Sequence, residues 1–302
     1  AAIKPNKHVF MEKPLAVDVP GYHKIIEIGK LATEKQLNVV VGLQRRYNTA
    51  TQELVKRIHD GRIGEINSLN VYYNVGAPKI HPRLAGQKEM EYQLRNWRYF
   101  TWLWGGQIAG QAIHQIDVMN WVMQDYPIVA RGVGGRQTFY GPDQGNTFDH
   151  FYVEYQYPNG VKMHMQCRNM DNCWSRMGFE IHGSLGYADE RDRIYDKKGN
   201  ILWRFRERDE MQGASQLEQN VFINSILNGS YINNTEYGAK SSLTAIFGRM
   251  ATHSGQETKI EQVLASDLRI GPQEHTWDAK MPDMPDESGN YEVPIPGKTK
   301  VL

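Results

Sequence analysis

Two side chains capable of proton chemistry, His114 and Asp117, lie three residues apart in the segment 105–123. Apolar residues recur through this segment at helical spacing, which predicts a helix with one apolar face. Residues three apart project from adjacent turns of one helix face, so an imidazole and a carboxylate would stand side by side. Such a pair could hold a polyol and remove one of its protons. From the helix alone, the alternative is a buried helix with a hydrogen-bonded histidine and a solvated aspartate.

The composition of the 302 residues limits the function further. The chain is 40% hydrophobic and 23% charged with a net charge of +1, which is ordinary for a globular protein. The small net charge, with no basic run, argues against a nucleic acid or a membrane surface as partner, and no run of 18 apolar residues is present to span a bilayer. Cys167 and Cys173 predict neither a disulfide framework nor a metal site.

Residues 8–43 predict a β-α-β unit. Short apolar runs at 8–11 and 38–43 are typical of strands in a parallel sheet. Between them, Asp18 is a good N-cap and Pro20 suits the first turn of a helix that extends to about residue 36. One such unit cannot bury both faces of its sheet. We therefore expect the sheet to be completed elsewhere in the chain or by a preceding part of the protein.

The remaining chain predicts a different architecture. Pro158 to Gly160 separate two alternating runs and predict a hairpin. The predicted strands are 67–75, 131–139, 150–157, 161–168 and two further strand pairs within 178–189 and 196–204, and the predicted helices are 48–59, 216–227 and 237–253. Residues 76–95 are expected to be irregular, and the proline-rich tail from 281 to be extended. The fold class is α/β over residues 1–47, then α+β over 48–302, with a large, mostly antiparallel open sheet and helices on one side.

Four stretches occur in one order: Glu12-Lys13-Pro14 after a strand, residues 42–48 after the next strand, His114-x-x-Asp117 on a helix, and the strand pair 178–189. Together they resemble the Gfo/Idh/MocA family of nicotinamide-dependent oxidoreductases. The resemblance implies that residues 1–47 are the last β-α-β of a Rossmann NAD(P)-binding domain. It also implies that 48–302 form the substrate-binding and oligomerisation domain, ending in the tail 281–302. The glycine-rich phosphate loop of that domain is not in the sequence, so we expect the chain to lack most of it.

The resemblance also implies roles for individual residues. Lys13 would lie beside the nicotinamide and stabilise the alkoxide that forms as hydride leaves, and His114 would accept the hydroxyl proton. Asp117 and Arg45 match sugar-contacting positions, and the aromatic stretch 97–104, including Trp97, suits the apolar side of a sugar ring. The expected cofactor contacts are Glu12, Lys13, Pro14, whose peptide bond is expected to be cis, and Arg46.

The leading hypothesis is hydride transfer between NAD or NADP and a secondary hydroxyl or keto group of a sugar, glycoside or cyclitol, in a homodimer or homotetramer joined through the open sheet. One position departs from the family pattern, because Gly110 stands where these dehydrogenases usually have an aspartate. One alternative is a glycosidase that uses bound NAD, although Gln111 stands where those relatives have a tyrosine. Another is a non-catalytic assembly module, if the protein begins at Ala1. The two cysteines fit a cytoplasmic protein, and export remains open.

Overall fold

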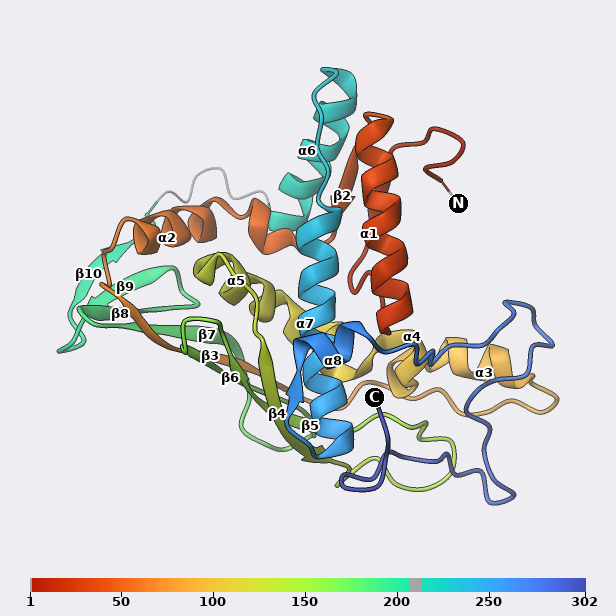
Figure 1. The fold of residues 1–302 in the computed structure, drawn as a ribbon. Helices are drawn as coiled ribbons and strands as arrows, with labels where there is room; N and C mark the ends of the chain where they lie inside the picture. The colour runs from red at the N-terminus through yellow and green to blue at the C-terminus, as the bar shows by residue number, and fades with distance from the viewer. Residues whose placement is uncertain (1, 207–212) are drawn as a thin grey trace.

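The computed structural model describes residues 2–206 and 213–302 (Figure 1). Strands β1 (Val9–Met11) and β2 (Val39–Val41) pair in parallel and are joined by helix α1 (Val19–Glu34). Oδ1 of Asp18 accepts a hydrogen bond from the Gly21 amide at 2.8 Å, so the predicted cap is confirmed. A segment distant in sequence covers the other edge of β2, where the Asn234 amide donates to the Val39 carbonyl at 2.9 Å.

A sheet of nine strands forms the rest of the described fold. Its order is β10-β9-β8-β7-β3-β6-β5-β4-β11. All neighbours are antiparallel except β3 and β6, which confirms the predicted fold class. The strands are β3 (Ile66–Val75), β4 (Val129–Gly135), β5 (His150–Gln156), β6 (Lys162–Asn169), β7 (Arg176–Gly183), β8 (Gly186–Asp189), β9 (Arg193–Asp196), β10 (Ile201–Arg204) and β11 (Thr258–Lys259).

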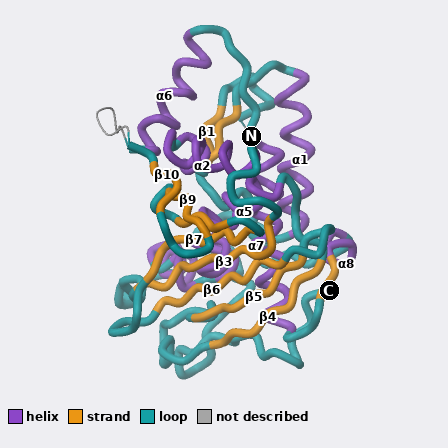
Figure 2. The backbone as a smooth tube through the Cα atoms, turned by 90° about the vertical axis from the view of Figure 1, so that its left-hand side faces the viewer, coloured by secondary structure: helices purple, strands orange, loops and turns teal. Residues whose placement is uncertain are grey.

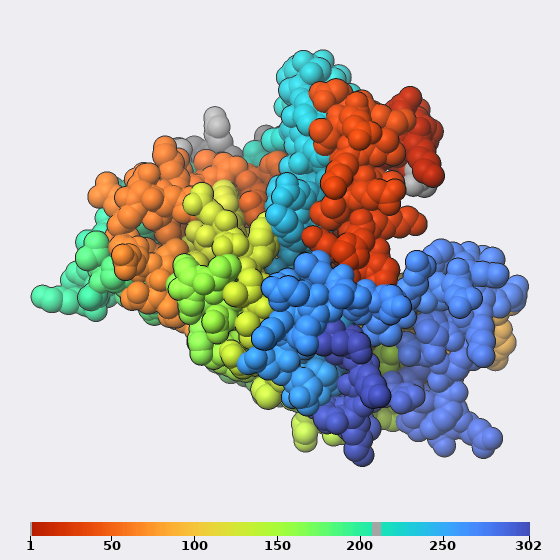
Figure 3. All heavy atoms as spheres, viewed as in Figure 1, coloured from red at the N-terminus to blue at the C-terminus, as the bar shows by residue number. Residues whose placement is uncertain are grey.

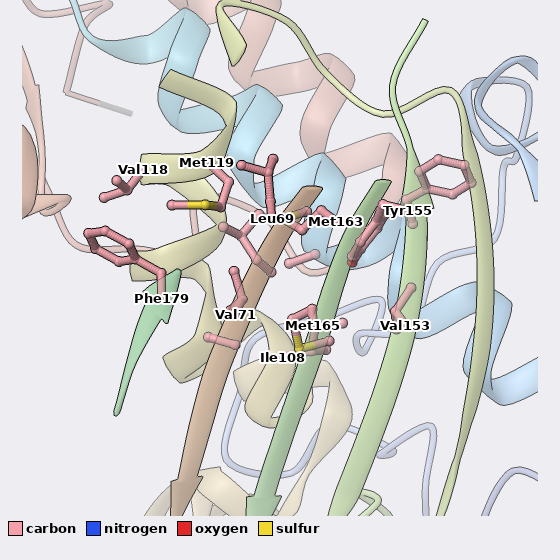
Figure 4. Packing of buried hydrophobic residues seen from close by; sticks show 14 of the residues in the cluster. Leu69, Val71, Ile108, Val118, Met119, Val153, Tyr155, Met163, Met165 and Phe179 are labelled. Carbon is pink, nitrogen blue, oxygen red and sulfur yellow. The ribbon is translucent and has the colours of Figure 1, made fainter. Parts of the chain in front are cut away.

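Helices α2 (Thr49–His59), α5 (Ile113–Met123) and α7 (Thr235–Ser254) lie on one face of this sheet (Figures 1 and 2). Helix α8 (Ile260–Leu264) follows β11, and α6 (Ala214–Leu227) lies beside β2. Alternate strand residues such as Leu69, Val71, Met163 and Met165 point toward the helices, where they meet Met119 and Ile108 (Figure 4). The period-2 pattern of the strands therefore places the core between sheet and helices.

The structure corrects three details of the predicted elements. Residues 76–95 contain a helix, α3 (Glu89–Arg95), which Tyr92 anchors in an aromatic cluster. Strand β4 ends at Gly135 rather than 139, because the amides of Gln137, Thr138 and Phe139 turn to donate to the Asp149 carboxylate. The segment 105–123 is not one helix. The short helix α4 (Thr101–Trp104) ends at Gly105 with φ +73°, and a π-helical turn, η3 (Ile108–Ala112), precedes α5.

The C-terminal segment lies across the surface beside the loops of the sheet (Figure 3). Tyr291 is 6% exposed and packs on Phe100, with 5.0 Å between ring centroids. The Asp143 amide donates to the Gly289 carbonyl at 2.9 Å. The tail is therefore extended, as predicted, and packs against the domain. Within residues 2–206 and 213–302, no helix has the length and hydropathy needed to cross a membrane, and no acidic, histidine or cysteine cluster suits a metal.

Candidate functional site

Lys13 occupies the turn that follows strand β1. The Lys13–Pro14 peptide is cis, as the resemblance led us to expect. The Lys13 ammonium donates to the Gly110 carbonyl, with 2.6 Å between Nζ and O. Burial, together with the nearby charge of Arg98, lowers the pKa of Lys13 despite the opposing effect of Glu12. The amine is thus fixed against the π-helical turn that leads into α5.

His114 lies one turn further along, in the first turn of α5. Its Nδ1 is buried without a hydrogen-bond partner among the described residues. Burial, and then the charges of Lys13 and Arg45, lower the pKa of His114 to about 3. The imidazole is therefore neutral near pH 7. Because Nδ1 is enclosed, Nε2 is the nitrogen that remains for an incoming hydroxyl group.

Gly110 is enclosed by the indole of Trp104. A Cβ atom built on Gly110 would lie 1.6 Å from Nε1 of Trp104, and Trp104 is only 2% exposed. No side chain fits at this position unless the indole moves. The structure thus explains why the family's usual aspartate has no counterpart here: the indole fills the space, and Lys13 binds a main-chain carbonyl instead.

Asp117 does not face the space around His114. Its carboxylate is 0% exposed and accepts hydrogen bonds from Nε and Nη2 of Arg46 at 2.8 and 2.9 Å and from Oγ of Ser241 at 2.8 Å. The Arg46 guanidinium also lies over the rings of Tyr237 and Trp121, at 4.3 and 4.9 Å. This placement differs from the expected substrate contact of Asp117 and cofactor contact of Arg46, because each group is already satisfied by the other.

Arg45 and Trp97 both lie close to the reactive pair. Arg45, on the 3-10 turn η1 (Gln44–Tyr47), is near enough to lower the pKa of His114. Trp97 is 42% exposed and packs edge-on against Trp104, with 6.0 Å between ring centroids. The sequence did not point to Arg98 and Tyr73, although the charge of Arg98 acts on Lys13 and the charge of Arg45 acts on Tyr73. Arg98 could have been predicted, because it is adjacent in sequence to the expected substrate contact Trp97. Tyr73 lies within a regular strand, and nothing in its sequence context distinguishes it.

Glu12 and Gly42 lie at the carboxyl ends of the parallel strands β1 and β2. A Cβ atom on Gly42 would lie 2.4 Å from the Glu12 carboxylate, so the absence of a side chain at Gly42 leaves room for Glu12. Glu218 of α6 lies nearby, and burial, reinforced by the charge of Glu12, raises its pKa to about 8. In open parallel sheets, ligands bind at the carboxyl ends of strands. Lys13, Glu12 and His114 therefore converge at the edge where a dinucleotide would bind.

Comparison with known proteins agrees with this arrangement. Residues 51–189 match the GFO/IDH/MocA C-terminal domain. This match identifies residues 51–189 as a domain of the GFO/IDH/MocA C-terminal type. An inositol 2-dehydrogenase of Pseudomonas fluorescens is 31% identical over 125 residues, which are 41% of this chain and 31% of that protein. The 2,7-anhydro-N-acetylneuraminate hydratase of Escherichia coli is 26% identical over 185 residues, which are 61% of this chain and 45% of that protein. The chain therefore matches less than half the length of these curated relatives.

Solved structures of two oxidoreductases share the fold. A scyllo-inositol dehydrogenase from Lactobacillus casei, solved with NAD(H) and scyllo-inositol, matches 86% of this chain and 75% of its own, with a TM-score of 0.63 and 18% identity. An aldose-aldose oxidoreductase from Caulobacter crescentus, solved with glycerol, matches 85% of this chain and 73% of its own, with a TM-score of 0.65 and 16% identity. These likenesses show that the chain has the same fold as these two oxidoreductases.

Proposed function

We propose that the protein is an NAD(P)-dependent oxidoreductase that transfers hydride between the nicotinamide and a secondary hydroxyl or keto group of a sugar, glycoside or cyclitol. The observation that supports this most directly is a fixed lysine beside a neutral imidazole. Lys13 is held by the Gly110 carbonyl at 2.6 Å, and the charge of Lys13 helps to keep His114 unprotonated. The match of residues 51–189 to the GFO/IDH/MocA C-terminal domain and the inositol dehydrogenase relative support the same reaction class.

In this proposal each residue handles one part of the alcohol. The Lys13 ammonium donates to the hydroxyl oxygen and stabilises the negative charge that develops as the C–H bond breaks. Nε2 of His114 accepts the hydroxyl proton, for which the imidazole must begin neutral. Trp97 offers an aromatic face to the apolar side of the ring, and Arg45 contacts the substrate. Asp117 instead fixes the position of η1 through Arg46.

The residues at the strand ends fit a nicotinamide, which supplies the hydride acceptor when bound. Glu12, Lys13 and Pro14 form the turn after β1, and Gly42 admits the Glu12 carboxylate. We assign these residues to the cofactor side of the site. We likewise assign residues 1–47 to a dinucleotide-binding domain and 48–302 to the substrate-binding domain.

The hydratase relative favours a second candidate function. Oxidation of one ring carbon acidifies the neighbouring C–H bond, which permits elimination and then return of the hydride. The reaction would use the same residues but leave no net reduced cofactor. This class includes an NAD-dependent glycosidase.

The uncovered face of the sheet supports a homo-oligomer as part of the proposal. Val133, Tyr152, Gln166 and Tyr72 form a row across four neighbouring strands on the face opposite the core. Val133 is 65% exposed and Tyr152 is 39% exposed. Large exposed apolar patches mark interaction surfaces. Light scattering of wild type and a Val133→Glu variant would test this, because a monomer in both would contradict the assembly.

The function is tested by cofactor binding followed by turnover. Titration of the intact protein, together with any segment that precedes residue 1, with NAD⁺ and NADP⁺ should show micromolar binding of one of them by tryptophan fluorescence. A panel of sugars, glycosides and cyclitols should then give reduced nicotinamide in wild type but not in Lys13→Met or His114→Phe. Product formation without net reduced nicotinamide would select the second candidate. Absence of cofactor binding would refute the proposal.

A further inference from the structure

Two adjacent arginines on η1 have opposite environments. Arg46 donates two hydrogen bonds to the buried Asp117 carboxylate. The Arg45 guanidinium forms no hydrogen bond and no ion pair within 4 Å among residues 2–206 and 213–302. Its nearest defined contact is the ring of Phe179, whose centroid lies 5.7 Å from Cζ. A guanidinium presents five donors, so Arg45 is a partly buried cation whose donors are all unused.

The carboxylates near Arg45 do not bind it directly. Glu190 is already paired with Arg176, at 3.0 Å. Asp192 accepts a hydrogen bond from the Thr51 hydroxyl at 3.3 Å, and burial raises the pKa of Asp192 to about 6. Burial outweighs both carboxylates and lowers the pKa of Arg45. The free energy cost of desolvating this guanidinium is therefore not offset by a direct partner within the described fold.

Arg45 lies close to the first turn of α5, because the adjacent Arg46 is hydrogen-bonded to Asp117, three residues after His114. The charge of Arg45 lowers the pKa of His114, and Tyr73 lies within electrostatic reach of both Arg45 and Arg98. Arg98 in turn acts on Lys13. Two cations, Lys13 and Arg45, thus act on the neutral imidazole. The carboxylate near Lys13 is Glu12, and those near Arg45 are Asp192 and Glu190. Both groups that act on His114 are therefore positively charged.

We propose that the substrate is a sugar acid whose carboxylate binds the Arg45 guanidinium beside His114. This rests on the proposed function and names its substrate class. Arginine binds carboxylates through two parallel hydrogen bonds, which fixes the orientation of the sugar as well as its affinity. A neutral polyol would leave the Arg45 donors without a charged partner. Binding of the carboxylate would place a neighbouring secondary hydroxyl at Nε2 of His114.

The test compares acids with neutral sugars of the same shape. Isothermal titration of the protein with glucuronate, galacturonate and mannuronate is set against the methyl ester of each, which removes only the charge. Glucose 6-phosphate reports whether a phosphate is preferred. At least one acid should bind 10-fold or more tightly than its ester, and the preference should weaken as salt is raised.

Three variants locate the effect. Arg45→Gln should remove the preference for the acid, and Arg45→Lys should retain part of it because the charge remains but the paired donors are lost. Arg95→Gln, at an exposed arginine of α3, should leave the preference unchanged. Circular dichroism confirms that each variant is folded.

The inference is overturned if no acid binds more tightly than its ester, if Arg45→Gln keeps the preference, or if glucose 6-phosphate binds more tightly than every acid. These outcomes are independent of the hydride-transfer test. Oxidation of neutral sugars alone would retain the proposed function and overturn this inference. Acid binding that depends on Arg45, in a protein that binds no nicotinamide, would retain this inference and overturn the proposed function.

Discussion

Replacement of Asp117 by asparagine should destabilise the protein strongly although it changes hardly any volume. The carboxylate is 0% exposed, and Arg46 is 16% exposed, so the pair lies away from solvent. Asparagine retains one acceptor oxygen and turns its NH₂ group toward the guanidinium, which has only donors. Breaking a buried pair in this way costs about 3–5 kcal/mol, because an uncompensated charge remains. At roughly 2 °C per kcal/mol, the melting temperature should fall by about 6–10 °C.

Calorimetry or denaturation followed by circular dichroism measures this effect, and two variants serve as controls. Asp278→Asn makes the same change in the exposed pair Lys88–Asp278, whose side chains are 55% and 79% exposed, and should leave the melting temperature unchanged. The double variant Arg46→Met, Asp117→Leu removes both charges and should recover most of the loss. A loss for Asp117→Asn no larger than that of Asp278→Asn would refute the buried pair. A double variant as unstable as the summed single variants would refute the electrostatic origin.

Three further variants follow from the same contacts. Gly110→Ala should lower the free energy of unfolding by about 1–3 kcal/mol, because the added methyl group collides with Trp104; urea denaturation measures this. The control Gly271→Ala should cost little, because the nearest neighbour of its methyl group would lie at 3.8 Å. Equal costs for the two variants would contradict the enclosure of Gly110. In the folded protein His114 stays neutral down to about pH 3, whereas the imidazole of the unfolded chain protonates below pH 6.5, so the stability of the folded protein falls as the pH is lowered from 6.5 to 3. The melting temperature of His114→Gln should therefore depend less on pH in this window. A pH dependence equal to that of wild type would contradict the lowered pKa of His114. Although burial opposes the shift, hydrogen bonds from His150 and Thr138 lower the pKa of Asp149 to about 2 from 3.8, so the stability that this carboxylate provides is present above pH 3.8 and lost toward pH 2. Asp149→Asn should therefore cost about 2 kcal/mol at pH 6 and much less at pH 2.5. A cost that does not change with pH would refute the lowered pKa of Asp149.

Sequence predicted the elements whose causes are local. Asp18 and Asn48 cap their helices through hydrogen bonds to amides three residues ahead. Pro158 to Gly160 connect two antiparallel strands whose register alternates as expected. Helix α3 was missed because its stability depends on groups distant in sequence, such as the Tyr291 hydroxyl that donates to Glu89 and the Asp283 carbonyl that accepts from Gln93. Local propensity contains no information about such partners.

In the candidate site, too, the sequence predicted what depends on local order and missed what depends on distant partners. Lys13 and His114 were identified from their order along the chain, and the structure places both at Gly110 and its helical turn. The π-helical turn could not be predicted, because a shift of the hydrogen-bond ladder by one residue leaves the apolar pattern almost unchanged. The direction of Asp117 was also not predictable. Its spacing from His114 fixes only their relative angle on the helix, and its partner Arg46 is 71 residues away.

The position of Asp117 links stability to substrate binding. By binding Arg46, it fixes η1, and η1 also holds the neighbouring Arg45. Arg45 has no direct partner of its own, so its place beside His114 depends on this anchored backbone. The Asp117→Asn variant, assayed well below its melting temperature, should therefore also bind sugar acids more weakly, although the Asp117 carboxylate is buried and bonded to Arg46 and Ser241. The charge-removed double variant, which restores packing but not the anchor, separates the two effects. Recovered stability with weakened acid binding is expected, and recovery of both would show that Arg45 is positioned independently of the Arg46–Asp117 pair.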